Sequence, residues 1–319
     1  MVIEDFRGDF EDVAGLVQRA WADNEQRPVL YTKEFLASQF GYPGSAPSLA
    51  PTLYDGARPM AFVAGFPRRI RFLGREWRVA VAAFLSVANE FKRRGYGILL
   101  WGELARRVRA AGYDGLVSFG VEGDPMNGMI LGGGSLLKIP IGRVHAVSYL
   151  SGILWPKEAV ESRGPAEDSL IDDFLELSVP IAGRTPLARV WSRDEAEWQC
   201  RRRLGAVAVR PEAGPRCGVL TGYVMPVADH RRTSCLLVED IFWGDLNREE
   251  RLTLVRRIKG EAAAAGARLA VVPVQGYADV GPFLESGFQL SRRIVQTYLS
   301  LWDASPEPGL LDSIYLDVF

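Results

Sequence analysis

A basic turn containing two glycines is the part of this sequence whose residue types most clearly indicate ligand binding. An apolar segment, residues 79–88, precedes Lys92-Arg93-Arg94-Gly95-Tyr96-Gly97, and a helical pattern follows. Glycine lets the backbone turn tightly and approach a ligand, the first helical N–H groups lack partners, and the helix dipole adds partial positive charge there. The three cationic side chains add mobile positive charge. We therefore expect the turn to hold an anionic group such as a diphosphate.

Two alternative roles for this turn compete with a diphosphate site. A basic glycine turn can be a solvated connection between a strand and a helix, because a short Gly-x-Gly alone is a weak signal. A dinucleotide site would need a third glycine where Leu100 stands, together with a βαβ unit and an acidic residue about twenty positions on. The strand before the turn instead completes a hairpin, since residues 69–73 and 77–81 flank Gly74-Arg75-Glu76. This order disfavours NAD.

The turn and its surroundings resemble the GNAT acyltransferase superfamily. The central motif of that family is Gln or Arg, two residues, Gly, one residue, then Gly or Ala, between its fourth strand and third helix. Residues 92–97 match, except that Lys92 stands where Gln or Arg is usual. The resemblance implies that backbone amides of the turn hold the diphosphate of coenzyme A and that the preceding strand pairs with the pantetheine arm. The coenzyme-binding residues implied are Leu85, Ser86, Val87, Lys92, Arg93, Arg94, Gly95, Tyr96, Gly97, Ile98 and Asn127.

The elements that must position this motif predict an α/β fold of the α+β kind, with two GNAT-like domains. Each domain is expected to be a mixed, mostly antiparallel sheet flanked by helices. Hydrophobic periodicity in the first half predicts strands at 1–6, 48–54, 59–73, 77–87, 115–121 and 139–154, and helices at 10–21, 33–40, 97–111 and after Asp124. We expect Gly132-Gly133-Gly134 to break the last of these helices early.

The second half repeats the later part of this pattern. Strands are predicted at 233–243, 268–274 and 288–301, with helices at 247–265 and 277–286. Its strand-to-helix turn, Trp243-Gly244-Asp245-Leu246-Asn247, carries an acidic residue and no cation, so a diphosphate would find little there. We predict a GNAT domain with a coenzyme A loop over 1–155, a linker over 156–168, and a degenerate GNAT-like domain without a coenzyme loop over 169–319.

Three side chains are candidates for the chemistry that the resemblance implies, in which an amine attacks a thioester. Such a reaction needs a base or path for the amine proton, a backbone donor for the carbonyl, and an acid for the departing thiolate. Glu122 follows a predicted strand and could be the base or bind the amine cation, although charged residues at strand ends are usually solvated. His145 and Tyr149 share one face of the last predicted strand, where packing is the alternative role.

The resemblance also implies further details of this site. The backbone N–H of Val87 is the candidate donor to the thioester carbonyl. Many family members carry a tyrosine about seven residues after the Asn that matches Asn127, and here the triple glycine region occupies that position. Asn127 is expected either to contact the pantetheine or to cap and order the helix entry.

Composition and charge argue against several classes of function. A net charge of -1 is not typical of a general nucleic-acid or membrane-surface binder. The longest apolar runs fall below the roughly 18–20 residues needed to span a bilayer, and the first residues show no secretory signal. Three cysteines without Cys-x-x-Cys spacing and only two histidines favour free thiols over disulfides or zinc. We expect a cytoplasmic protein without a metal site.

These features together predict an acyl-CoA-dependent N-acyltransferase. Acetyl-CoA or another acyl-CoA is the expected donor, and a small-molecule amine is the expected acceptor. A second possibility is transfer from a carrier-bound or tRNA-bound acyl group, although enzymes of that kind generally lack a phosphate loop. A third is a non-catalytic acyl-CoA-binding module, which the missing tyrosine favours. The acyl length, the amine and the oligomeric state stay open.

Overall fold

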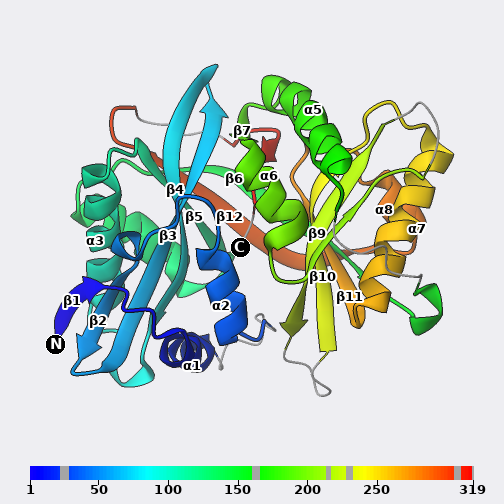
Figure 1. Cartoon of the computed structure of the whole chain (residues 1–319). Helices are drawn as coiled ribbons and strands as arrows, with labels where there is room; N and C mark the ends of the chain where they lie inside the picture. Colours follow the sequence, from blue (N-terminus) through cyan, green and yellow to red (C-terminus); the bar gives the residue numbers. More distant parts are fainter. Residues whose placement is uncertain (22–28, 160–165, 213–216, 228–232, 305–309, 318–319) are drawn as a thin grey trace.

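One continuous sheet organises the whole molecule. The computed structural model describes residues 1–319 except 22–28, 160–165, 213–216, 228–232, 305–309 and 318–319. Its 13-stranded, mostly antiparallel sheet runs in the order β1-β2-β3-β4-β5-β12-β6-β11-β10-β9-β8, and β7 and β13 pair off this path (Figure 1). The α/β fold class expected from the sequence is confirmed. No helix among the described residues combines the length and apolar character needed to cross a membrane.

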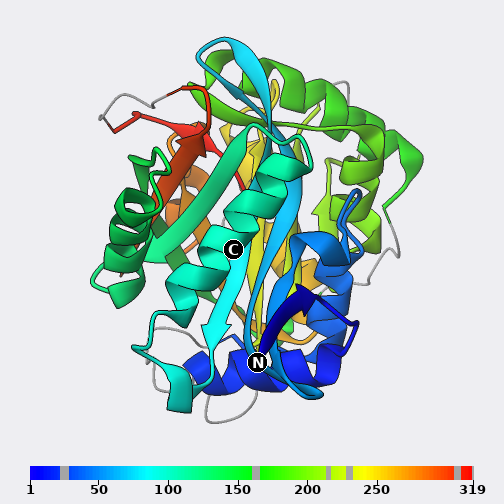
Figure 2. The same ribbon diagram turned by 90° about the vertical axis from the view of Figure 1, so that its left-hand side faces the viewer.

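The first half follows the predicted order of elements. Its strands are β1 (Val2–Asp5), β2 (Pro51–Asp55), β3 (Arg58–Phe72), β4 (Arg75–Val87), β5 (Gly115–Val121) and β6 (Gly142–Ile153). Its helices are α1 (Phe10–Trp21), α2 (Lys33–Phe40), α3 (Tyr96–Ala110) and α4 (Pro125–Leu136). Figure 2 shows α3 lying across the sheet of this half, with α1 at the lower end. Helix α1 buries Val13, Leu16 and Val17 because their spacing places them on one face.

Helix α4 corrects the expectation that the triple glycine ends the helix early. The helix begins after Asp124, whose side chain accepts a hydrogen bond from Met126 N, and continues through the glycines to Leu136. A Cβ on Gly134 would lie 2.7 Å from Ile141 Cγ2, so this position needs glycine for close packing. Tertiary contact and a good N-cap therefore outweigh the weak helix propensity of glycine here.

The second half contains the predicted strands and additional elements before them. Its helices are α5 (Asp168–Arg184), α6 (Arg193–Glu197), α7 (Arg248–Ala264) and α8 (Gly281–Glu285). Its strands are β7 (Leu187–Val190), β8 (Ala206–Val209), β9 (Val219–Val227), β10 (Thr233–Phe242), β11 (Ala267–Val274), β12 (Gln289–Leu301) and β13 (Ile314–Tyr315). Helix α8 covers only part of the predicted 277–286. It begins at Gly281 because the Asp279 side chain accepts from Gly281 N and Pro282 occupies the first turn.

The last long strand of each half, β6 or β12, pairs with a strand of the other half. Strand β12 pairs with β5 along one edge and with β6 along the other, both antiparallel. Strand β6 in turn pairs with β11 of the second half. The predicted linker, 156–168, falls partly on residues 160–165, which lie outside the described residues, and the division into two domains stays a prediction.

A buried cluster of charges joins the C-terminal segment to both halves. The Asp317 carboxylate accepts from Arg68 Nε at 2.8 Å and lies 3.3 Å from Arg189 Nη1, and all three side chains are at most 5% exposed. Burial alone would raise the pKa of Asp317, but the charges of Arg189 and Arg68 more than offset it and hold the pKa well below its usual range. Strand β13 pairs with β7, and β7 pairs with β3, so this cluster closes the junction between the halves.

We expect Asp317→Ala to lower the free energy of unfolding by about 3–5 kcal/mol, because two buried guanidinium groups would lose their counter-charge. Denaturant titration at neutral pH measures this loss. The difference from the wild type should shrink below about pH 4, because a carboxylate with a lowered pKa stabilises the fold above its unfolded pKa and loses that effect as pH falls.

Glu90→Ala is the control for this substitution, because Glu90 pairs with Arg58 on the exposed surface. It should leave the unfolding midpoint nearly unchanged. An Asp317→Ala loss no larger than that of the control would contradict the role assigned to the cluster.

Candidate active site

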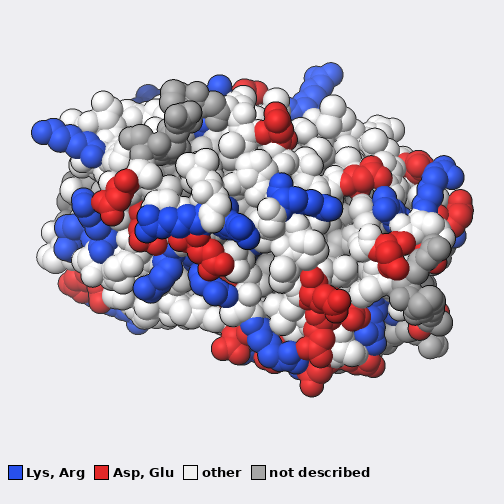
Figure 3. All heavy atoms as spheres, turned by 90° about the horizontal axis from the view of Figure 1, so that it is seen from above, with Lys and Arg blue, Asp and Glu red and all other residues white. Residues whose placement is uncertain are grey.

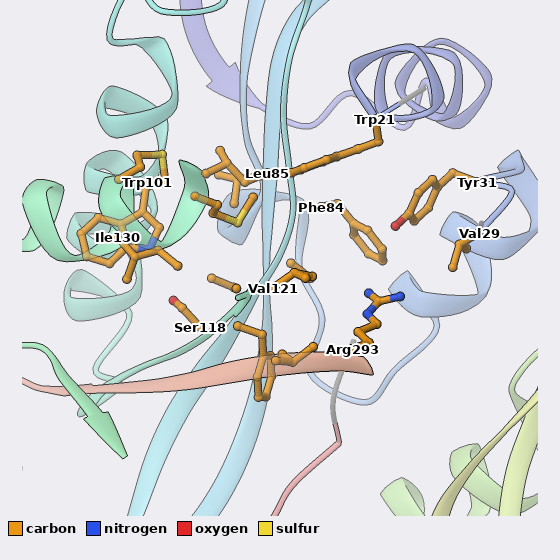
Figure 4. A pocket seen from close by; sticks show the side chains of 18 residues that line it. Trp21, Val29, Tyr31, Phe84, Leu85, Trp101, Ser118, Val121, Ile130 and Arg293 are labelled. Carbon is orange, nitrogen blue, oxygen red and sulfur yellow. The ribbon is translucent and has the colours of Figure 1, made fainter. Parts of the chain in front are cut away.

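A gap between two parallel strands forms the centre of the candidate site. Strands β4 and β5 pair only through Val79–Ala82 and Gly115–Ser118, and the two strands separate beyond these residues. Each keeps its other neighbour, since β4 stays paired with β3 and β5 with β12. A pocket of about 110 Å³ lies in this gap, lined from both strands and from α1, α3 and α4 (Figure 4). The gap thus exposes strand edges without unravelling the sheet.

A bulge in β4 turns backbone groups toward this gap. Phe84 and Leu85 together face the single residue Val63 of β3, and Phe84 has φ 60°, which is rare for a bulky residue. The extra residue of a bulge is left out of the ladder. Ala88 N donates to Met60 O of β3, so alternation along the strand directs the N–H of Val87 into the gap. Both positions can therefore donate to a ligand in the gap.

The N-terminus of α3 is open to an anion. Its N-cap is Gly95, in the left-handed conformation with φ 84°, and no side chain caps the helix. A Cβ placed on Gly95 would meet nothing within 4 Å. Arg93 and Arg94 are exposed beside this turn. The unused N–H groups, the helix dipole and these two cations together suit a diphosphate.

The side chain of Lys92 is held by a hydrogen bond, whereas the sequence predicted a mobile cation. Its Nζ donates to Ala20 O at 2.8 Å, so it ties the turn to the end of α1. Ser86 is held in a similar way, because its hydroxyl accepts from Trp21 Nε1 at 2.9 Å. The expected contacts from Ser86 to a pantetheine would thus come from its main chain.

A larger cavity lies on the other side of the gap. Its volume is about 530 Å³, and Glu122, Tyr149 and Arg292 line it together with aromatic and apolar side chains from both halves. It shares four lining residues with the smaller pocket: Val29, Tyr31, Phe84 and Arg293. In Figure 4 the side chains of Phe84, Tyr31 and Arg293 point toward one another at this junction. A ligand in the gap and a second ligand in the cavity would therefore meet near Phe84.

The structure brings together two of the three side chains predicted for catalysis. Glu122 and Tyr149 both line the larger cavity. Gln296 Nε2 donates to Glu122 Oε1 at 3.0 Å and orients the carboxylate. Burial raises the pKa of Tyr149. His145 lies away from both pockets, and its Nδ1 is 2.7 Å from Leu311 O.

Asn127 orders the entry of α4. Its Nδ2 donates to Val121 O at the end of β5, and its Oδ1 accepts from Tyr298 OH at 3.0 Å. The side chain also packs against Gly120, where a Cβ would lie 2.2 Å from Asn127 Oδ1. Of the two roles expected for Asn127, this geometry favours ordering of the helix entry.

Several lining residues were not anticipated from the sequence. Tyr223 comes from β9 and Arg293 from β12, which reach the cavity only because β12 lies between β5 and β6. No short motif marks either residue. The bulge at Phe84 also left no distinct sequence signal.

The second half has a similar pair of parallel strands with a bulge, but buried side chains occupy the space between these strands. Strands β10 and β11 are parallel, pair only near 234–237, and β10 carries a bulge at Glu239. Glu239 forms a buried ion pair with Arg203 rather than facing a cavity. Tyr315 OH, from the C-terminal segment, donates to Asp240 of β10 at 2.6 Å.

The helix that follows β10 differs from α3 at its N-terminus. Asn247 Oδ1 accepts from Glu250 N at 3.1 Å, and Glu250 Oε2 accepts from Asn247 N at 2.8 Å. This capping box satisfies N–H groups that an anion would otherwise bind. Gly244 packs against the backbone of Cys217, so this turn has no open space either.

Known structures share this architecture. A structure of Saccharomyces cerevisiae N-myristoyltransferase with bound myristoyl-CoA and inhibitors matches with a TM-score of 0.74 and 15% identity, over 97% of this chain and 81% of that chain. A second, with bound myristoyl-CoA, gives 0.75 and 14% over 96% and 80%. A GCN5-related N-acetyltransferase from Anabaena variabilis gives 0.55 and 10% over 95% and 73%. The chain has the GNAT fold. No family model and no curated protein sequence matches it.

At these low identities the similarity concerns the fold. The GNAT resemblance noted from residues 92–97 is confirmed at that level. The matches cover nearly the whole chain, so the shared architecture includes the second half as well as the half that carries the glycine turn.

We expect Asn127→Ala to lower the free energy of unfolding by about 1–3 kcal/mol, because Val121 O and Tyr298 OH would lose their partner. Chemical denaturation measures this effect. Asn89→Ala is the matched control, since Asn89 is exposed just after the end of β4. Equal stability of the two variants would contradict the ordering role of Asn127.

Proposed function

We propose that the protein transfers an acyl group from an acyl-CoA to an amine. The observation that carries this proposal is the gap between β4 and β5, with the uncapped N-terminus of α3 beside it and a larger cavity joined to it at Phe84. Coenzyme A can be placed with its diphosphate at the N-terminus of α3 and its pantetheine along β4. The thioester then lies at Phe84, where the two pockets join. The structural neighbours support the donor class, because they are N-acyltransferases by name and two contain myristoyl-CoA.

The proposed reaction is direct attack of the amine on the thioester. The amine nitrogen bonds to the carbonyl carbon, the C–S bond breaks, and coenzyme A leaves as the thiolate. Glu122 accepts the amine proton, while Gln296 keeps its carboxylate oriented. Backbone N–H groups at the β4 bulge and at Val87 stabilise the negative charge that develops on the carbonyl oxygen.

Tyr149 suits substrate positioning better than proton donation. Burial raises its pKa above the usual value of about 10, whereas a thiol titrates near 8.5. Proton transfer from this tyrosine to the leaving thiolate would therefore be unfavourable. A hydrogen bond from its hydroxyl to the acceptor remains favourable, and the thiolate can leave without an acid.

We propose one coenzyme site in each chain. The capping box of α7 and the buried side chains between β10 and β11 occupy the positions that α3 and its gap leave open. Transfer from a tRNA-bound donor is less well supported. On the face shown in Figure 3, positive and negative side chains are interspersed rather than gathered into a basic surface.

The acceptor that we propose is a small-molecule amine with an apolar or aromatic body, used in the cytoplasm. Tyr31, Phe35, Phe84 and Tyr223 form an aromatic wall of the larger cavity. The rings of Phe35 and Tyr223 are stacked with centroids 6.4 Å apart. A flat apolar group packs well on such a wall, and Glu122 lies in the same cavity to receive the ammonium group.

Gly95→Val tests the coenzyme site. The new side chain would enter the open space in front of α3, so we expect coenzyme A affinity in titration calorimetry to fall by roughly tenfold or more. Gly112→Val is the matched control, because Gly112 has φ 78°, open surroundings and a place at the opposite end of the same helix. Both variants carry similar backbone strain, about 1–2 kcal/mol. Unchanged affinity in Gly95→Val would contradict the assignment.

Glu122→Gln tests the proposed base. We expect kcat/KM for the amine to fall by roughly 10²–10⁴-fold, because the amide keeps the shape of the carboxylate but cannot take a proton. Coenzyme A affinity should stay at the wild-type value. His145→Gln is the comparison variant, since His145 lies away from both pockets, and it should retain activity. A larger loss in His145→Gln than in Glu122→Gln would reverse these roles.

A further inference from the structure

Two buried polar side chains face the closed end of the smaller pocket. Ser118 is 4% exposed and Trp101 is 2% exposed, and both line the pocket in the gap. Neither Ser118 Oγ nor Trp101 Nε1 has a hydrogen-bond partner among the residues that the structure describes. An unpaired polar group in a protein interior is destabilising and calls for an explanation. A ligand group in this pocket would supply the missing partner.

These side chains lie where the gap closes. Ser118 is paired with Ala82, the last pair before β4 and β5 separate, and Trp101 lies in the second turn of α3. Figure 4 shows the Trp101 indole nitrogen and the Ser118 hydroxyl on the same side of the pocket, beside Ile130. If a thioester lies at Phe84 and its acyl group enters the smaller pocket, that group approaches Ser118 and Trp101.

The volume of the smaller pocket suits a short acyl group. A cavity of about 150 Å³ holds one benzene molecule, with six carbon atoms. By proportion, a volume of about 110 Å³ holds about four non-hydrogen atoms. A short acyl group fits this space, whereas a long saturated chain would have to extend into the larger cavity that adjoins it at Phe84.

The two side chains also limit the chemistry of the acyl group. An indole N–H only donates, and a serine hydroxyl donates or accepts, so an oxygen atom on the acyl group can accept a hydrogen bond from either. Arg293 is the one charged residue among the described residues that line the pocket, and Figure 4 places it on the side opposite Trp101. A neutral oxygen therefore matches the closed end better than a carboxylate.

We propose that the donor is an acyl-CoA whose short acyl chain carries a neutral oxygen, as a hydroxyl or a keto group. Ser118 and Trp101 bind that oxygen and select for it over a plain alkyl chain. This inference rests on the proposed function, because it specifies the donor for the same site.

Titration calorimetry of the full chain with matched thioesters tests the inference. The probes are free coenzyme A, butyryl-CoA, 3-hydroxybutyryl-CoA, acetoacetyl-CoA and myristoyl-CoA. The wild type should bind at least one of the oxygen-bearing thioesters roughly tenfold or more tightly than butyryl-CoA. Ser118→Ala and Trp101→Phe should each reduce this ratio toward one and leave the affinity for free coenzyme A unchanged. Ser135→Ala, on the exposed surface of α4, should keep the wild-type ratio.

The thermal midpoint separates recognition from a structural role. Ser118→Ala removes an unpaired buried hydroxyl, so the ligand-free variant should be at least as stable as the wild type. A clear loss of stability would indicate a structural bond and overturn the inference.

Three binding results would also overturn it: equal affinity of the wild type for butyryl-CoA and both oxygen-bearing thioesters, tightest binding of myristoyl-CoA, or an equal loss of free coenzyme A affinity in the variants. The last result would assign the two groups to the pantetheine. Absence of any coenzyme A binding by the wild type would instead overturn the proposed function itself.

Discussion

The backbone hydrogen bonds on the two edges of β12 hold the candidate site together. One edge fixes β5, which is a wall of the gap, and the other edge fixes β6, which carries Tyr149. Residues 291–295 of the same strand reach the pockets directly. If β12 were absent, β5 would keep only its short pairing with β4, and the gap would have no rigid wall. The open geometry of the first half thus depends on a strand that the second half supplies.

A second constraint acts at the other end of the junction. Asp317 is buried between Arg68 of β3 and Arg189 of β7, so the C-terminal segment is fixed by charge as well as by strand pairing. Together β12 and this cluster connect the two halves through different strands, β5 and β6 in one case and β3 and β7 in the other. Such fixation suits a site whose pockets are lined by residues of both halves, because catalysis depends on keeping two reactants in a defined geometry.

The sequence predicts local elements well and long-range pairing poorly. The bounds of α1, α2 and β5 agree with the predicted ranges, and α1 has a clear helical period while β5 is a short apolar run that is buried almost throughout. The prediction that the triple glycine ends α4 early was wrong, because the close packing of Gly134 on Ile141 depends on the tertiary structure. The threading of β12 between β5 and β6 also leaves no local pattern, since an alternating strand can pair with any suitable edge.

In the candidate site, too, local features could be predicted from the sequence and long-range contacts could not. The turn at residues 92–97 and the position of Glu122 could be inferred from residue types and order. The anchoring of Lys92 by Ala20 O and the approach of Arg293 could not, because both depend on contacts across the fold. Strand alternation predicts that His145 shares one face with Tyr149, but it could not reveal the contact between the His145 ring and Leu311 O.

The exchange of β6 and β12 has a consequence for dissecting this molecule. Cutting the chain between the halves would not release two complete folding units, because each fragment would keep a strand that belongs in the other sheet. The fragments would expose the edges of β5 and β11, which are templates for aggregation. Produced together, they could pair again through the same edges, as two fragments of a split protein do. The two halves therefore share an architecture, but they fold as one cooperative unit because a single sheet runs through both.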